Sequence, residues 1–158
     1  MITINQVTDP QEIELLFEAY RAFYDQVPTE AARQFLHDRI TQGESVALVM
    51  KDGGMSIGFV QLYPVFSSLQ CQKAFILNDM YMTAAYRNKG LGEQLLQEVF
   101  RFAKAQGACY VTLETMPTNA PAKALYKKSR DDSRYDAALY KDVVIFSTLY
   151  KKTSKYHE

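Results

Sequence analysis

A basic loop with two glycines, Arg87-Asn88-Lys89-Gly90-Leu91-Gly92, stands between an apolar segment and the start of an amphipathic one. Glycines let a backbone approach a ligand closely, and the N–H groups of a helix's first turn have no partner within the helix. Together with the positive end of the helix dipole, such N–H groups can bind a phosphate or pyrophosphate. The loop therefore predicts an anion site. The alternative is a tight turn that only packs the helix close to a strand.

Two better-known phosphate loops do not fit this spacing. A P-loop needs Gly-Lys-Ser/Thr at the helix start, whereas Gly92 is followed by Glu93. The dinucleotide fingerprint needs further glycines at the positions of Asn88 and Leu95. Neither kind of nucleotide site is therefore predicted.

Side chains that could move protons flank the loop in the sequence. Asp79 precedes it, Glu114 lies in a later apolar segment, and Tyr126 follows Leu125 in a short helical pattern. A carboxylate can accept a proton, and a phenol with a pKa of about 10 can donate one. The alternatives are a core tyrosine at Tyr126 and solvated or paired carboxylates at Asp79 and Glu114.

The elements that must position these residues alternate along the chain. Asp9-Pro10-Gln11-Glu12 predicts a capped helix start, and a second helix is expected from Thr29 to Gly43. Lys51-Asp52-Gly53-Gly54 predicts a hairpin turn, and Pro64 with Ser67-Ser68 predicts a loop. Further helices are expected from Gly90 to about Gly107 and at Ala120–Lys128. Strands are expected at Ile2–Val7, Val46–Met50, Ile57–Tyr63, Ala74–Met82, Tyr110–Thr115, Tyr135–Tyr140 and Val143–Tyr150.

The resulting order, β-α-α-β-β-β-α-β-α-β-β, predicts a single α/β domain over residues 1–158 with a mixed sheet. The 18 basic and 18 acidic residues give zero net charge, which argues against a nucleic-acid partner. Two cysteines and two histidines offer no familiar metal motif, so no metal is expected. No apolar run approaches the roughly 20 residues of a membrane span, and no signal peptide is evident, so a cytoplasmic protein is expected.

Taken together, the strand, the Arg-x-x-Gly-x-Gly loop, the helix, the next strand and a short helix with Asn119 and Leu125-Tyr126 form a larger pattern. This pattern resembles the GCN5-related N-acetyltransferase superfamily. The resemblance covers nearly the whole chain in element order, and its specific motifs occupy Leu77 to Lys128. It implies an acyl-CoA N-acyltransferase fold with about seven strands flanked by four helices. It further implies acetyl-CoA as co-substrate, a homodimer, and direct attack of a primary amine on the acetyl group.

The resemblance also assigns roles to individual residues. It implies that the loop residues Arg87, Asn88, Lys89, Gly90, Leu91 and Gly92 hold the pyrophosphate of acetyl-CoA. Backbone groups of Met80, Tyr81 and Met82 would bind pantetheine and the acetyl carbonyl, on a strand splayed from the Tyr110 strand. Asn119 would contact the cofactor arm, and Tyr126 would protonate the leaving thiolate.

The chain departs from the family at two places. Polyamine acetyltransferases resemble it around Leu77-Asn78-Asp79 but carry Glu where Asn78 stands, and an amide cannot act as a base. The family's Leu-Tyr-x-x-x-Gly-Phe is not continued, because Lys127-Lys128-Ser129-Arg130 follows Tyr126. Asp79 and Glu114 are therefore the candidate routes for the amine proton, with Glu18 more distant.

By the same resemblance the acceptor lies between the first two helices and the sheet, near Tyr20, Phe23, Tyr24 and the segment Tyr63-Pro64-Val65-Phe66. Aromatic walls suit an alkylamine or cation, although Tyr20 could equally be a core residue. Three functions stay open. The first is acetylation of a small amine, amino acid or polyamine, which the neutral charge favours. The others are acetylation of a protein lysine or N-terminus, and a non-catalytic coenzyme A-binding dimeric module.

Overall fold

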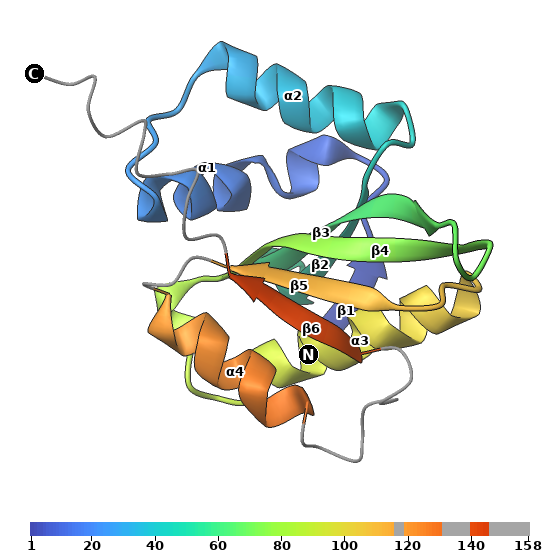
Figure 1. Ribbon diagram of the computed structural model, residues 1–158. Helices are drawn as coiled ribbons and strands as arrows, with labels where there is room; N and C mark the ends of the chain where they lie inside the picture. The colour runs from blue at the N-terminus through green and yellow to red at the C-terminus, as the bar shows by residue number, and fades with distance from the viewer. Residues whose placement is uncertain (116–118, 131–139, 146–158) are drawn as a thin grey trace, which may run out of the picture.

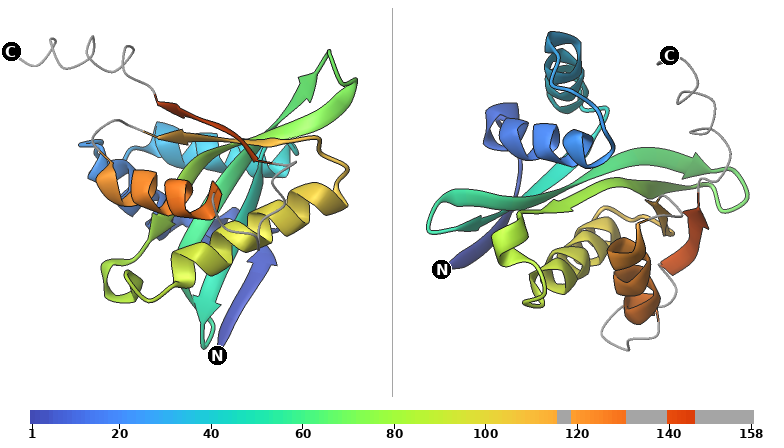
Figure 2. Two further views of the ribbon diagram at one scale, coloured as in Figure 1. Left: turned by 60° about the horizontal axis from the view of Figure 1, so that its bottom comes forward. Right: turned by 90° about the vertical axis from the view of Figure 1, so that its left-hand side faces the viewer.

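The computed structural model describes residues 1–115, 119–130 and 140–145 as a sheet covered by helices on both faces. Helices α1 (Glu14–Phe23) and α2 (Glu30–Thr41) lie on one face, and α3 (Leu91–Ala105) and α4 (Ala120–Arg130) lie on the other (Figures 1 and 2). The α/β class and the four predicted helices are thus confirmed.

The sheet runs in the order β1-β2-β3-β4-β5-β6. Its strands are β1 (Ile2–Gln6), β2 (Val46–Asp52), β3 (Met55–Ser67), β4 (Gln72–Met82), β5 (Val111–Thr115) and β6 (Tyr140–Ile145). The first four pair antiparallel, and β4–β5 and β5–β6 pair parallel, so the sheet is mixed as predicted.

The prediction of about seven strands is not met, because six strands lie within the described residues. Two closing strands were expected at 135–140 and 143–150. The structure instead has one strand, Tyr140–Ile145, that joins both ranges. The remainder of the two predicted strands lies outside the described part of the chain.

The predicted caps fold as expected in the N-terminal half. Asp9 accepts a bond from the Gln11 N–H at 3.0 Å and completes a capping box with Glu12. The capped turn is a short 3-10 helix, Pro10–Glu12 (η1), and α1 begins after it, at Glu14. Thr29 caps α2 by accepting from the Ala32 N–H at 3.1 Å.

The β2–β3 hairpin turns at Gly53 and Gly54, whose φ angles of 55° and 88° suit glycine. The loop predicted at Pro64 is wrong, because Pro64 lies within β3 and pairs with Phe75. Strand β2 pairs with β3 only as far as Leu62. Pro64 lies beyond that point, where the edge of β3 that faces β2 makes no strand-pairing hydrogen bonds within the described part of the chain. A proline there therefore breaks none.

Each face of the sheet has its own hydrophobic core. The larger core packs α3 and α4 against the sheet through residues such as Leu77, Leu95 and Val99. The smaller core packs α1 and α2 through Phe17, Leu36 and Phe59. The sheet therefore separates the two cores.

Candidate active site

A bulge in β4 turns two consecutive polar side chains toward the α1–α2 face. Gln61 pairs with Asp79 and Leu62 with Leu77, so Asn78 is the extra residue of the bulge. Before the bulge Leu77 points into the α3–α4 core, and after it Met80 packs on that same side. Asn78 and Asp79 therefore both line the space under α1 and α2.

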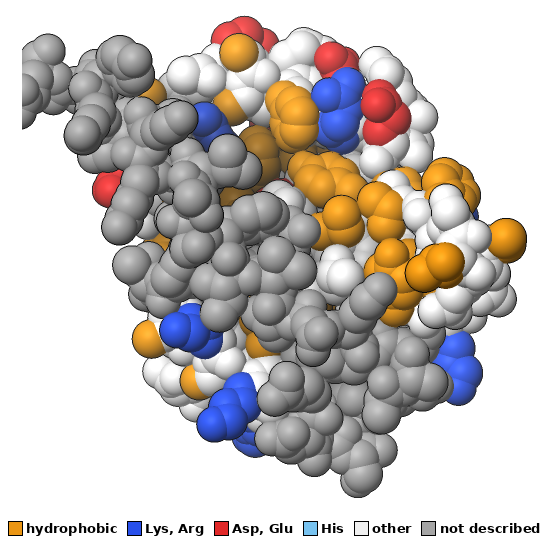
Figure 3. All heavy atoms as spheres, viewed as in Figure 1, with side chains coloured by type: hydrophobic (Ala, Val, Ile, Leu, Met, Phe, Trp, Pro, Cys, Tyr) orange, Lys and Arg blue, Asp and Glu red, His pale blue; other side chains and the backbone are white. Residues whose placement is uncertain are grey.

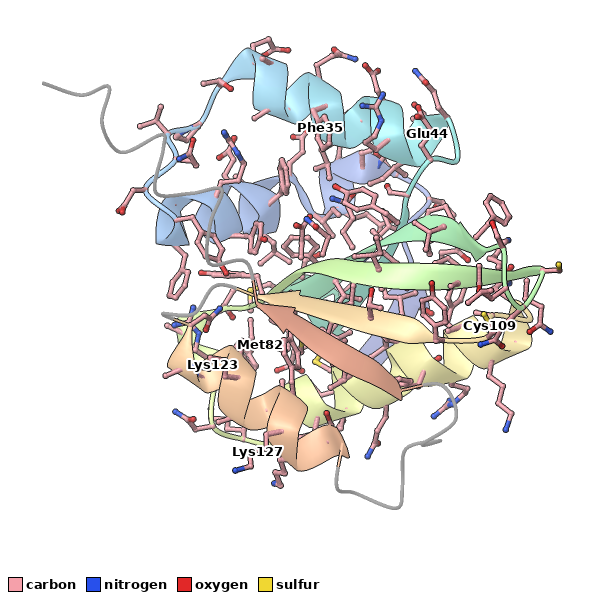
Figure 4. The ribbon with its side chains drawn as sticks, in the orientation of Figure 1. Phe35, Glu44, Met82, Cys109, Lys123 and Lys127 are labelled. Atoms are coloured by element: carbon pink, nitrogen blue, oxygen red, sulfur yellow. The ribbon has the colours of Figure 1, made fainter. Side chains whose placement is uncertain are left out.

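That space is a cavity of about 540 Å³ between the two N-terminal helices and the sheet. Hydrophobic side chains gather between α2 and the sheet in Figure 3, and Phe35 projects from α2 toward the sheet in Figure 4. The lining is mainly aromatic, with a few polar side chains: Phe17, Tyr20, Arg21, Tyr24, Gln26, Ala32, Phe35, Tyr63, Asn78 and Asp79.

Asp79 lies at the floor of the cavity and is only 3% exposed. Its Oδ2 accepts a hydrogen bond from Gln61 Nε2 at 2.6 Å, and its Oδ1 accepts one from Asn78 Nδ2 at 2.8 Å. Burial raises the pKa of Asp79, and the hydrogen bonds from Asn78, Gln61 and Tyr20 act in the opposite direction. Its carboxyl group thus keeps a proton to higher pH than an exposed aspartate does.

The three tyrosines predicted to bind the acceptor all line this cavity. The Tyr20 hydroxyl donates to the Asn78 carbonyl at 3.3 Å, and the Tyr63 hydroxyl accepts from Gln61 Nε2 at 3.1 Å. Burial raises the pKa of both Tyr20 and Tyr63, with the negative charge of Asp79 acting in the same direction. Tyr24 stacks edge-on against Tyr20 with ring centroids 5.2 Å apart.

On the other side of this site, β4 is longer than its pairing with β5. The two strands pair only from Phe75–Leu77 to Val111–Leu113, although β4 continues to Met82. Met80, Tyr81 and Met82 lie beyond the last paired residue, and the splay predicted there stays a prediction, because residues 116–118 are outside the described part of the chain. Figure 4 shows Met82 at this end of β4. Glu114 lies next to the predicted splay in β5, where it pairs with Val144.

Tyr126 of α4 packs against this end of β4. It is 2% exposed, and its hydroxyl lies 4.0 Å from the Met80 sulfur. Asn119 caps α4 by accepting from the Ala122 N–H at 3.2 Å, and its Nδ2 donates to the Tyr24 hydroxyl at 3.1 Å. Asn119 thus links the helix that carries Tyr126 to the helix that lines the cavity.

The basic loop leads directly from β4 into α3. Asn88 and Gly90 have φ angles of 59° and 75°, and Gly90 caps α3 without a side-chain hydrogen bond. Arg87 Nε donates to the Met82 carbonyl at 2.8 Å, and its guanidinium lies 5.4 Å from the Tyr81 ring centroid. The first-turn N–H groups of α3 can therefore bind an anion beside the end of β4.

Gly92 brings the loop, the strand and α4 together. A Cβ atom at this glycine would lie 3.5 Å from Leu125 and 3.7 Å from Met80. The loop, the end of β4 and the Tyr126 helix thus form one continuous surface. This surface suits a long ligand with a phosphate-bearing part at the loop and a reactive end near Tyr126.

Several residues of the site were not predicted from the sequence: Phe17, Arg21, Phe35, Ser45 and Gln61. Gln61 had a usable signal, because it lies inside the largely apolar segment Ile57–Tyr63, which is typical of a buried strand. Ser45 and Arg21 carried no comparable signal. The aromatic residues fit a helical core pattern equally well.

Among the described residues, no group of three or more His, Cys, Asp or Glu side chains could hold a metal ion. None of the helices in this part of the chain has both the length and the apolar character needed to cross a membrane.

Comparison with known proteins assigns this chain to a class. The acetyltransferase (GNAT) family pattern matches residues 13–131. The chain is 38% identical over 125 residues to the uncharacterized N-acetyltransferase YhfO of Bacillus subtilis (strain 168), covering 78% of this chain and 84% of that protein. The chain belongs to the acetyltransferase (GNAT) family and is an acetyl-CoA-dependent N-acetyltransferase.

Solved structures agree with this membership. A crystal structure of a probable acetyltransferase superposes with a TM-score of 0.75 at 30% identity, covering 93% of this chain and 99% of that one. Arabidopsis thaliana NAA60 in complex with acetyl-CoA has a TM-score of 0.66 at 20% identity. It covers 82% of this chain and 83% of that one, and it shares the fold.

Proposed function

We propose that this enzyme acetylates a small primary amine bound in the cavity beneath α1 and α2. The observation that carries the proposal is Asp79, a carboxyl group buried at the floor of an aromatic cavity and next to the Met80–Met82 end of β4. A cation or amine suits both the aromatic walls and the carboxylate. The reacting nitrogen would then lie close to the strand that separates the cavity from the loop side.

The residues on the loop side fit acetyl-CoA. Acetyl-CoA supplies a thioester whose acetyl group passes to the amine nitrogen. The first-turn N–H groups of α3 would hold its pyrophosphate, together with the backbone of Gly90, which is in the left-handed conformation. The β4 backbone at Met80–Met82 lies beyond the last residue that pairs with the described part of β5, and it would bind the pantetheine arm. The related fold of NAA60 binds acetyl-CoA, which supports this arrangement.

Asp79 would accept the proton that the attacking amine must lose. An alkylamine has a pKa near 10.4 and attacks only in its neutral form. A carboxylate whose pKa is raised by burial is a stronger base than an exposed one, so it takes this proton more readily. Glu114 is the second candidate for this role, from its position in β5 beside the predicted splay.

Tyr126 would donate the proton that the leaving thiolate needs. Its hydroxyl lies next to Met80, at the end of the strand proposed to hold the acetyl group. Asn119 would help to orient α4 through its cap and its bond to Tyr24, besides its proposed contact with the cofactor arm.

The cavity's charges favour an acceptor with one cationic nitrogen. Among its described lining residues, Asp79 is the single carboxylate and Arg21 the single cation. A polyamine needs several acidic partners and would be repelled by Arg21. A monoamine, or an amino acid whose carboxylate meets Arg21, fits better than a polyamine.

Thiol release from acetyl-CoA, measured over a panel of free monoamines, amino acids, polyamines and lysine peptides, tests the proposal. We expect turnover with a monoamine or amino acid, and a loss of about 10²-fold or more in kcat for Asp79→Asn with this acceptor. Acetyl-CoA affinity should stay unchanged in the variant. Turnover confined to peptides would refute the small-molecule acceptor.

Acetylation of a protein lysine or N-terminus is the second candidate, because α1 and α2 leave the cavity open enough to admit an extended side chain. A homodimer is proposed from the family resemblance alone. Light scattering on the purified protein would test it.

A further inference from the structure

Gln61 is the most deeply buried polar side chain near the cavity, and the mechanism above does not use it. Its side chain is 0% exposed in the middle of β3. Burying an amide is unfavourable unless its donors and acceptor are hydrogen-bonded. Three hydrogen bonds, to three different residues, meet this requirement.

These bonds give the amide one direction. The Ser45 hydroxyl donates to Gln61 Oε1 at 3.1 Å, so the oxygen end faces Ser45. The nitrogen end then faces Asp79 and Tyr63, to which it donates at 2.6 Å and 3.1 Å. Ser45 is itself only 5% exposed, so water has little access to its hydrogen bond with Gln61.

We propose that Gln61, oriented by Ser45, is a positioning residue that fixes the Asp79 carboxyl group toward the acceptor cavity and favours its charged form. This inference rests on the proposed role of Asp79 in acetyl transfer. Asn78 holds the other carboxyl oxygen, so the two amides together fix the plane of the group. The remaining lone pairs of the carboxylate are left for the amine proton.

Other charged and titratable groups also face Asp79 or its neighbours. Tyr20 and Arg21 approach from α1, and both line the cavity. Tyr63 lies on β3, and the positive charge of Arg39 on α2 partly offsets the rise in the pKa of Tyr63. Gln61 differs from all of these because it is uncharged, so its effect on Asp79 comes from hydrogen bonding and not from a net charge.

The test combines two variants with two readouts. Gln61→Leu removes both donors, and Gln61→Glu replaces the amide with a second carboxylate beside Asp79. We expect each to raise the pKa of Asp79, by about one unit or more, because a lost charge-assisted bond or an added like charge disfavours the carboxylate. The acidic limb of the kcat/KM profile should move upward by the same amount.

Carbon-13 NMR of labelled aspartate carboxyl groups in the free enzyme reads the Asp79 pKa without any turnover. An unchanged Asp79 pKa in the folded variants would overturn the inference. A raised pKa with an unmoved acidic limb would support the role of Gln61 and refute the proposed proton transfer through Asp79. These outcomes distinguish a failure of the inference about Gln61 from a failure of the proposed role of Asp79.

Two further variants complete the design. Ser45→Ala removes the group that orients the amide, and it decides the question if the Gln61 variants do not fold. We expect a smaller upward shift in the same direction, and no shift would contradict the inference. Gln34→Leu is the matched control, because Gln34 donates to Asp38 at 2.8 Å on the exposed side of α2. It should leave the Asp79 pKa and the profile unchanged.

Discussion

At Asp79, burial and hydrogen bonding act in opposite directions. Desolvation favours the neutral acid, and the amides of Gln61 and Asn78 favour the carboxylate. The balance leaves the pKa above that of an exposed aspartate, so the native state binds this proton at pH values where the unfolded chain has released it. Asp79 therefore makes the folded protein less stable at neutral pH than an aspartate with an unshifted pKa would, at the position proposed to supply the base.

The upward shift of the Asp79 pKa predicts how stability changes with pH. The favourable contribution of protonated Asp79 is complete below its unfolded pKa and is lost as the pH rises through its folded pKa. Wild-type protein should therefore lose stability relative to Asp79→Asn over this window. Urea unfolding of both proteins from pH 4 upward measures the difference. Parallel stability curves would contradict the raised pKa.

Tyr126 makes a second prediction at this scale. Tyr126→Phe keeps the buried ring and removes only the hydroxyl, so folding should be preserved. We expect kcat to fall by about 10²-fold or more with the best amine between pH 7 and 9, because the thiolate loses its proton donor. Acetyl-CoA affinity, measured by calorimetry, serves as the control. Full activity across this range would show that Tyr126 is not the acid.

At the scale of elements, the β4–loop–α3 unit joins the two halves of the proposed site. Strand β4 presents Asp79 to the cavity and Met80 and Met82 to the opposite face, while Tyr81 packs on the α1–α2 side. The basic loop then leads from β4 into α3. The bulge at Asn78 makes this possible, because it reverses the alternation of side chains between Leu77 and Met80.

Gly90 allows this unit to be tested with a matched control. Gly90 and Gly107 lie at opposite ends of α3 with φ angles of 75° and 73°, and a Cβ atom at either has no neighbour within 4 Å. Alanine at each should therefore destabilise the fold similarly, by about 1–2 kcal/mol. Only Gly90→Ala should weaken acetyl-CoA binding in calorimetry. Equal affinities would remove the loop from the donor site.

Much of the element pattern could be predicted because local signals dominate it. Asp9, Thr29 and the Gly53-Gly54 turn act through neighbouring residues, and the sequence shows those neighbours. Pro64 was misassigned because its place in β3 depends on where β2 ends, which is a tertiary fact. The bulge at Asn78 was not predicted for the same reason, because only the pairing of β4 with β3 reveals it.

At the scale of the whole molecule, the sheet separates the proposed donor site from the proposed acceptor site. Helices α3 and α4 lie on one face of the sheet, and α1 and α2 lie on the other (Figure 2). The loop and Tyr126 belong to the α3–α4 side, whereas the cavity is lined by residues of α1 and α2. The family resemblance predicted that the acceptor site lies between the first two helices and the sheet. It also predicted that Tyr20, Tyr24 and Tyr63 lie there. The buried Ser45–Gln61–Asp79 chain escaped prediction because it joins residues from separate segments.

The central claim is that the amine binds in this cavity, and filling the cavity tests it most directly. Ala32 of α2 lines the cavity, and its neighbour Ala31 is exposed on the same helix. We predict that Ala32→Phe raises the KM for the amine roughly tenfold or more, equivalent to about 1.4 kcal/mol of binding, whereas Ala31→Phe leaves it unchanged. The KM for acetyl-CoA should stay constant in both. An unchanged amine KM in Ala32→Phe would contradict the account.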